Sequence, residues 1–170
     1  MAGIELLGSG KIALGTLPTS ITNINGAAAT ANLTLTIGSS GVNTFRGGIG
    51  DDAVTLTGGT NNVSTSDGND TVNLSTGSDT VTTGSGDDSV VAAAGTNNIT
   101  TGANDDQVTL TGGTNTVNSG ADDDLITISN GSQTVNTETG NDIITVYGGT
   151  NTITLGQGND NITLVSGTNS

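Results

Sequence analysis

The 170-residue chain contains no cysteine, no histidine and no tryptophan, and it has one proline, one tyrosine and one phenylalanine. The missing cysteines exclude disulfides as a source of stability. Without histidine or cysteine ligands, zinc and copper centres are poor interpretations. There is also no histidine base and no cysteine nucleophile, so nothing in the sequence supports an enzyme. So few large side chains make a conventional two-layer core unexpected.

Positive charge is almost absent. Lys11 and Arg46 face 16 acidic residues, for a net charge of -14, and no base follows Arg46. Phosphate binding needs Lys and Arg, so we expect no nucleic-acid partner, and an anionic membrane would repel the chain. No stretch is long and apolar enough to suggest membrane insertion, and the first residues lack the pattern of a signal peptide. Cations are the expected partners.

Glycine and aspartate recur with a period of 18 residues. Seven blocks run from Ser39 to Leu164 without insertion or deletion, so Ser39 is repeat position 1. Position 3 is always glycine, and positions 7, 16 and 18 are aliphatic except at Phe45 and Ala92. Position 14 is aspartate in every block: Asp52, Asp70, Asp88, Asp106, Asp124, Asp142 and Asp160. Such a strict period predicts a repeat architecture.

The parity of the repeat positions predicts the fold. Positions 5, 7 and 9 share one strand face, positions 14, 16 and 18 share another, and their aliphatic members turn both faces inward. Short strands joined by glycine turns bury a face only by stacking coil on coil. We therefore predict an all-β protein, a right-handed parallel β-solenoid (β-roll) of seven coils over residues 39–170. Residues 1–38 break the period and are predicted to form an irregular cap or assembly segment.

Stacking would place the position-14 aspartates about 4.8 Å apart. Like charges at that distance repel by roughly 3 to 4 kcal/mol at an effective dielectric of about 20. The repeats contain no Lys or Arg, apart from Arg46 in the first block, to offset this repulsion. A metal ion bound by the carboxylates and the carbonyls of the glycine turns would offset this repulsion. Ligands that are all oxygen atoms, on flexible turns, favour Ca²⁺.

The segment "GGIGDDAVT", residues 47–55, resembles the hemolysin-type (RTX) calcium-binding nonapeptide G-G-x-G-x-D-x-U-x, where U is aliphatic. The resemblance implies a calcium-loaded β-roll and an extracellular destination by type I secretion. Seven acidic turns imply about six ions between neighbouring coils. The third glycine of the pattern is Gly50, Gly68, Gly86, Gly140 and Gly158, but Asn104 and Asp122 replace it in two coils. Position 13 supplies weaker ligand candidates that should point outward: Asp51, Asp87, Asp105 and Asp123.

At the other edge of the coil, the family aspartate is replaced by an amide in every block except the third, which has Asp79. The position-5 residues of this edge include Asn61, Asn97, Asn115 and Asn151. Amides both donate and accept, so we predict a neutral amide ladder without ions there.

Outward threonines on the following strand face suggest an ice-binding surface: Thr82, Thr100, Thr116, Thr134, Thr152 and Thr154. The plainer interpretation is that β-branched polar residues suit an exposed strand. Taken together, the calcium-binding repeats and the lack of catalytic residues favour a secreted structural protein. We expect it to assemble head to tail with itself through residues 1–38 and its last coil. A calcium-dependent ice-binding protein is the alternative.

Overall fold

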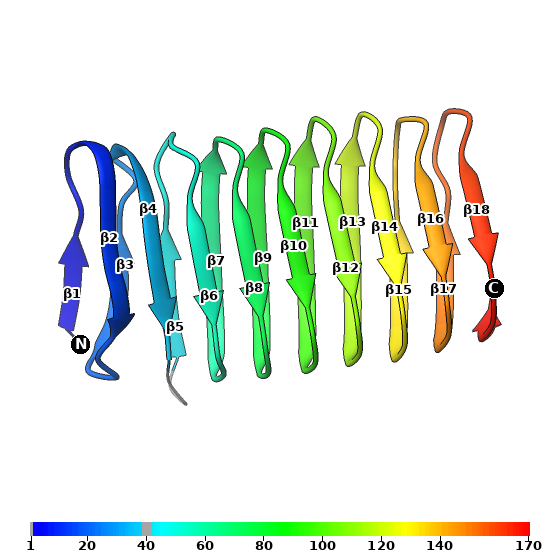
Figure 1. The fold of residues 1–170 in the computed structure, drawn as a ribbon, viewed down its shortest axis with the longest axis horizontal. Helices are drawn as coiled ribbons and strands as arrows, with labels where there is room; N and C mark the ends of the chain where they lie inside the picture. The colour runs from blue at the N-terminus through cyan, green and yellow to red at the C-terminus, as the bar shows by residue number, and fades with distance from the viewer. Residues whose placement is uncertain (1, 39–41) are drawn as a thin grey trace.

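The computed structural model describes residues 2–38 and 42–170 and consists of parallel strands in two sheets (Figure 1). The ten-stranded sheet contains β1 (Ala2–Glu5), β3 (Ile21–Asn25), β5 (Val42–Arg46), β7 (Thr60–Asp67), β9 (Ser78–Ser85), β11 (Thr96–Ala103), β13 (Thr114–Ala121), β15 (Ser132–Asn136), β17 (Thr150–Thr154) and β19 (Thr168–Asn169). The nine-stranded sheet contains β2 (Ser9–Leu17), β4 (Thr30–Ile37), β6 (Ala53–Leu56), β8 (Thr71–Leu74), β10 (Ser89–Ala92), β12 (Gln107–Leu110), β14 (Leu125–Ile128), β16 (Ile143–Val146) and β18 (Asn161–Leu164). The prediction of an all-β parallel solenoid is confirmed.

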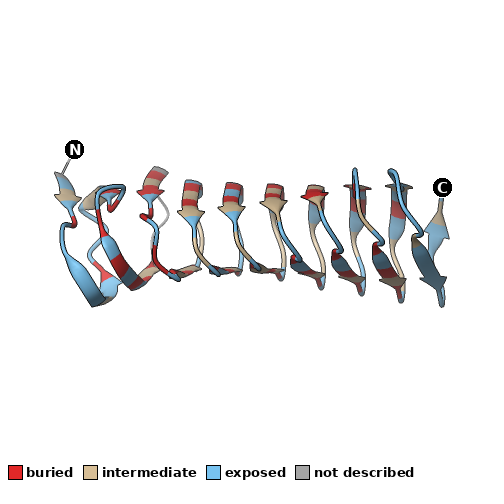
Figure 2. Cartoon of the chain, turned by 90° about the horizontal axis from the view of Figure 1, so that it is seen from above, coloured by how far each residue is buried: buried red, intermediate tan, exposed pale blue. Residues whose placement is uncertain are grey.

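Strand pairing follows the 18-residue period through the repeats. Val90 pairs with Val108 in the nine-stranded sheet, and Ile99 pairs with Val117 in the ten-stranded sheet. The inward side chains of both sheets form one hydrophobic core from Leu6 to Val146. Figure 2 shows buried segments on the strands of successive coils, whereas the C-terminal coil is exposed. Each coil therefore packs the same few aliphatic positions on those of its neighbours.

Residues 2–37 correct the predicted coil count. They form β1 to β4, which extend both sheets, so the solenoid has about nine turns rather than seven. Leu33, Leu35 and Ile37 are buried like the later core residues. Pairing partners lie 19 residues apart between β4 and β6, as in Leu35 with Val54, and β2 carries a bulge at Leu14. Because these coils are not 18 residues long, a search for the 18-residue period in the sequence does not find them. The predicted boundary at 38/39 adjoins residues 39–41, which lie outside the described residues.

Each coil has two turns, which lie on opposite edges of the flattened solenoid. We call repeat positions 9 to 14 the acidic edge; they form the ends of the odd-numbered strands β5 to β17 and the turns that follow, at residues 47–52, 65–70, 83–88, 101–106, 119–124, 137–142 and 155–160. They lie along the top in Figure 1. The row of position-5 residues at the start of the odd-numbered strands from β5 onward forms the amide edge. Among the described residues there is no helix with the length and hydrophobicity needed to cross a bilayer.

Candidate functional site: the acidic edge

The position-14 aspartates form a buried row along the acidic edge. Asp52 to Asp142 are at most 2 % exposed, and Asp160 in the last coil is half-buried. Each aspartate N–H donates to Oδ1 of the aspartate one coil further on, from Asp52 to Asp70 at 2.7 Å through Asp142 to Asp160 at 3.1 Å. The row begins where the Leu33 N–H donates to Asp52 Oδ1 at 2.8 Å. Backbone donors thus position one oxygen of every carboxylate in the row.

The second oxygen of these carboxylates has no hydrogen-bond partner. The buried, unpartnered atoms are Oδ2 of Asp52, Asp70, Asp88, Asp106, Asp124 and Asp142. Burying a charged acceptor without a partner costs several kcal/mol, and the cost falls only if the group is protonated or paired with a cation. Protons or cations spaced along the row, one near each coil, would therefore stabilise the folded chain.

Burial raises the pKa of five of these carboxyl groups. Desolvation is the largest effect at Asp70 and Asp106, and it lifts the pKa of each to about 7. The N–H of the preceding aspartate and a nearby hydroxyl lower the pKa, while neighbouring aspartates raise it again. The same burial raises the pKa of Asp52 and Asp124 to about 6, and the pKa of Asp88 is also raised. Without a metal, Asp70 and Asp106 therefore titrate close to neutral pH.

A row of buried hydroxyls at repeat position 9 faces the aspartates, and the sequence analysis missed it. Its members are fully buried: Thr65, Thr83, Thr101, Ser119 and Thr137. Thr83 Oγ1 donates to the Thr101 carbonyl at 3.0 Å, and the hydroxyl lies close enough to Asp88 to lower the pKa of that carboxyl group. The signal was present, because position 9 shares the inward parity of positions 5 and 7.

Gly47 occupies this hydroxyl position in the first repeat and matches the first glycine of the nonapeptide. A Cβ on Gly47 would collide with Asp52 Oδ2. The Asp52 carboxylate thus uses space that a hydroxyl side chain fills in the following coils.

The third glycine of the pattern brings backbone carbonyls close to the row. Gly68 and Gly86 both have a φ of 126°, and a Cβ on Gly68 would lie 2.6 Å from the Gly50 carbonyl oxygen. Gly140 and Gly158 meet the carbonyl of the preceding coil in the same way. Asn104 and Asp122 take a positive φ at this position, as these two residue types do at modest cost. Carbonyl oxygens therefore stack along the same turns as the aspartates.

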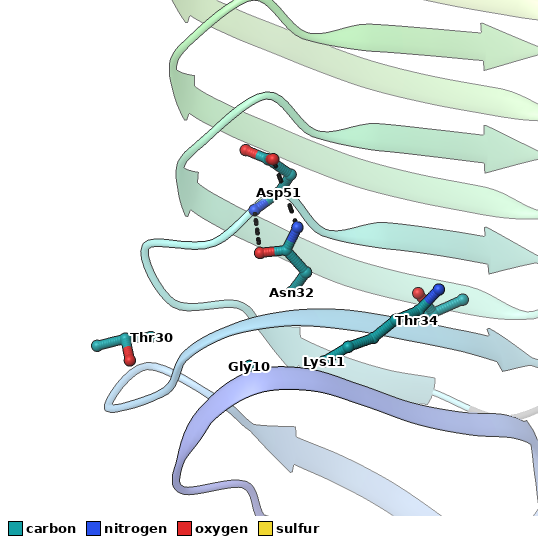
Figure 3. A pocket seen from close by; sticks show the side chains of 6 residues that line it. All are labelled: Gly10, Lys11, Thr30, Asn32, Thr34 and Asp51. Atoms are coloured by element: carbon teal, nitrogen blue, oxygen red, sulfur yellow. Dashed lines mark hydrogen bonds between the residues drawn. The ribbon is translucent and has the colours of Figure 1, made fainter.

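The position-13 aspartates lie outside this arrangement. Asp51, Asp87, Asp105 and Asp123 are exposed. They belong to an outer ladder in which backbone N–H groups donate to the preceding coil, as Asn69 does to Asp51 Oδ1 at 3.0 Å. Figure 3 shows the start of this ladder, where Asn32 and Asp51 exchange two bonds beside an open polar groove that Lys11 also lines. These carboxylates share surface hydrogen bonds and do not join the buried row.

The donor set fits a hard cation that prefers oxygen. Within residues 2–38 and 42–170, no three acidic side chains converge as a ready-made metal cluster. An ion in the row would therefore take at most two carboxylates, from neighbouring coils, and complete its shell with turn carbonyls and water. Ca²⁺ accepts six to eight such oxygens in flexible geometry. The candidate calcium ligands are therefore the unpartnered Oδ2 atoms and the carbonyl oxygens of the turns.

The amide edge satisfies its own hydrogen bonds over short runs. Asn97 Nδ2 donates to Asn115 Oδ1 at 2.7 Å, and Asn115 Nδ2 donates to Gln133 Oε1 at 2.8 Å. Asn61 Nδ2 and Asn151 Nδ2 also donate to the next coil. Most of these amides bond a carbonyl of their own turn as well, as Asn97 does to Ala94 at 3.2 Å. The donors pair amide with amide within these runs, except that Asn61 donates to the carboxyl group of Asp79.

The outward threonines lie on the ten-stranded sheet. Five are exposed and Thr100 is half-buried; the exposed ones are Thr82, Thr116, Thr134, Thr152 and Thr154. Register places Thr134 directly beside Thr116 and Thr152. Asn98 and Asn118 interrupt the two columns.

Comparisons with known proteins agree with this geometry. The model of the RTX calcium-binding nonapeptide repeat (4 copies) matches residues 37–72, 55–90, 64–99, 91–126 and 127–162. No curated protein and no solved structure gives a significant match to the chain. The family matches together span residues 37–162 and include the whole row of buried aspartates. The chain therefore belongs to the RTX calcium-binding nonapeptide repeat family, and its solenoid is a calcium-binding β-roll.

Proposed function

We propose that the chain is a secreted structural protein whose β-roll is held together by about six calcium ions along the acidic edge. One observation carries the proposal: six buried Oδ2 atoms lack a partner in a region without any Lys or Arg. Calcium neutralises the row only in the folded state, so its binding energy becomes folding energy. Extracellular calcium is millimolar in many settings, which suits sites of this kind.

Calcium titration of the EDTA-treated chain tests the proposal. Circular dichroism should report a gain of β structure on calcium addition, and metal analysis should give about six ions per chain. An unchanged spectrum together with no bound calcium would overturn the structural role of the ions.

Self-assembly is the second part of the proposal. In the described chain, β18 pairs only with β16, and its residues are exposed, including Leu164 at 51 %. At the other end β2 pairs only with β4. All strands are parallel, so β18 of one molecule has the correct direction to pair with β2 of the next. Lys11 on β2 would approach the acidic last coil. Such a contact between unlike ends propagates into a filament unless it closes into a ring.

Sedimentation in calcium tests the assembly. The protein should form concentration-dependent oligomers, and Leu164→Lys should keep it monomeric because a charge on the edge strand opposes pairing. Leu125→Lys is the matched control, since Leu125 is exposed in mid-solenoid. A wild-type chain that stays monomeric at high concentration would contradict the filament while leaving calcium binding intact.

Ice binding is a second candidate, favoured by the flat array of hydroxyls on the ten-stranded sheet. Thr114 and Thr116 in β13, and Thr150 and Thr152 in β17, are exposed pairs in register. Spacings would be about 4.8 Å between coils and about 6.6 Å along a strand. Thermal hysteresis that depends on calcium and falls in Thr116→Tyr would support ice binding. A chain without thermal hysteresis excludes it.

A further inference from the structure

The amide edge follows a simple rule. The side-chain Nδ2 of one coil donates to the side-chain oxygen of the next coil, as in Asn61 to Asp79, Asn97 to Asn115 and Asn151 to Asn169. Each residue in a continuous run must therefore accept on one side and donate on the other. An amide does both, whereas a carboxylate only accepts.

Two residues break this rule: Gln133 Nε2 donates to the Gly113 and Asn130 carbonyls instead of to the next coil, and Asp79 has no side-chain N–H to donate. Asp79 is 2 % exposed, and its Oδ1 accepts from Asn61 Nδ2 at 2.6 Å and from the Asn61 N–H at 3.2 Å. Its Oδ2 has no partner, and neither does Oδ1 of Asn97 in the following coil. Asp79 and Asn97 are paired in register. The structure thus has two buried acceptors, one on each side of a single gap between coils.

No positive charge lies near this gap. Among the strands packed around Asp79, only β7 contains another titratable residue, Asp67, which lies at the far, acidic end of that strand. Burial raises the pKa of Asp79, and its bonds from Asn61 partly offset that effect. Neighbouring charge is not among the causes, so the carboxyl group responds to desolvation and hydrogen bonding alone.

We propose that Asp79 binds a proton on Oδ2 in the native protein and donates a hydrogen bond to Asn97 Oδ1. A carboxylic acid has one donor and one acceptor in the plane of the group, so it reproduces the pattern of the amides above and below it. The proton joins two runs of the ladder, from Asn61 through Asp79 to Asn97 and onward. Loss of that proton leaves two acceptors facing each other, so the joint between these coils weakens as pH rises.

The test compares the thermal stability of the wild type and of Asp79→Asn in saturating calcium across pH. Asparagine supplies permanently the donor that the proton supplies in the wild type. The two proteins should melt together near pH 5. Near pH 9 the melting temperature of the wild type should be about 3 °C or more below that of Asp79→Asn. The folded pKa of Asp79 is raised, so its stabilising hydrogen bond is lost as pH rises through that value. Asp67→Asn is the control: it removes an exposed acid and should show no widening difference.

Two results would overturn the proposal. A stability difference independent of pH would mean that Asp79 is ionised throughout or makes no bond to Asn97. Loss of one bound calcium ion in Asp79→Asn would mean that a metal, rather than a proton, sits between the two acceptors. Carboxyl carbon NMR gives a direct check, because Asp79 should keep the chemical shift of a protonated acid at the pH values where the two proteins melt together.

Discussion

Removing calcium should invert the pH dependence of stability. Five aspartates of the buried row have folded pKa values above the unfolded value of about 3.9: Asp52, Asp70, Asp88, Asp106 and Asp124. In metal-free protein, their contribution is therefore fully present below about pH 4 and is lost as pH rises through the folded values. Those values are about 7 at Asp70 and Asp106 and about 6 at Asp52 and Asp124. Calcium needs ionised carboxylates, so the calcium-loaded protein should instead gain stability between about pH 5 and 8.

The magnitude follows from the shifts. One pKa unit corresponds to about 1.4 kcal/mol, so shifts of roughly two to three units cost about 3 to 4 kcal/mol per aspartate at pH 8. Adjacent aspartates relieve one another when one is protonated, so the total for four is less than their sum, on the order of 5 to 10 kcal/mol. That loss equals the whole stability of a typical domain. The metal-free chain should therefore be unfolded or nearly so above neutral pH and folded in mild acid.

Urea unfolding followed by circular dichroism, in EDTA and in millimolar calcium, measures this inversion across pH. A parallel series in high salt separates the row from general repulsion of the net charge, because salt screens surface charge far more than buried charge. If the EDTA-treated protein is as stable at pH 8 as in mild acid, the aspartates are paired by some other means and the reasoning fails.

Three further predictions use single substitutions. Asp106→Asn keeps the oxygen that accepts from the Asp88 N–H but removes the charge. It should therefore reduce the amount of bound calcium and lower the unfolding free energy by about 2 kcal/mol or more. Asp105→Asn removes an exposed charge and should change neither quantity. Gly86→Ala should destabilise more than Gly10→Ala in urea unfolding: both have positive φ, but only the Gly86 Cβ meets a neighbouring carbonyl. Asn115→Ala removes bonds to two coils and should cost about 2 to 4 kcal/mol in calorimetry, and a neutral result would contradict the ladder.

The alternation of side chains along each strand explains why the buried aspartates and the coil stacking could be predicted from the sequence. Position 14 shares an inward face with positions 16 and 18, so Asp52 to Asp142 were expected inside the turn, and they are buried. The 18-residue period likewise predicted parallel stacking because identical positions pair across coils, as Val90 and Val108 do. These features depend only on local alternation and on a repeat without insertions.

The rest required coordinates because it depends on coil length and on individual bonds. The shifts in spacing at β2 and β4 break the period while Leu33 and Ile37 stay buried, so counting at a fixed period of 18 gave too few coils. The role of Thr83 depends on whether its hydroxyl contacts a carboxylate or a carbonyl, which spacing alone does not reveal. The mismatch at Asp79 appears only when donors and acceptors are counted atom by atom.

The constant 18-residue offset between paired strands also bears on how quickly the molecule forms. Most β proteins must close long loops before distant strands meet, which makes them slow to fold. Here each strand of the repeats finds its partner one coil away, a separation of about a tenth of the 170-residue chain. Formation can start at any coil and spread to its neighbours, as in other stacked repeats. Removing one whole coil, such as residues 93–110, should therefore shorten the molecule while leaving its folding rate almost unchanged.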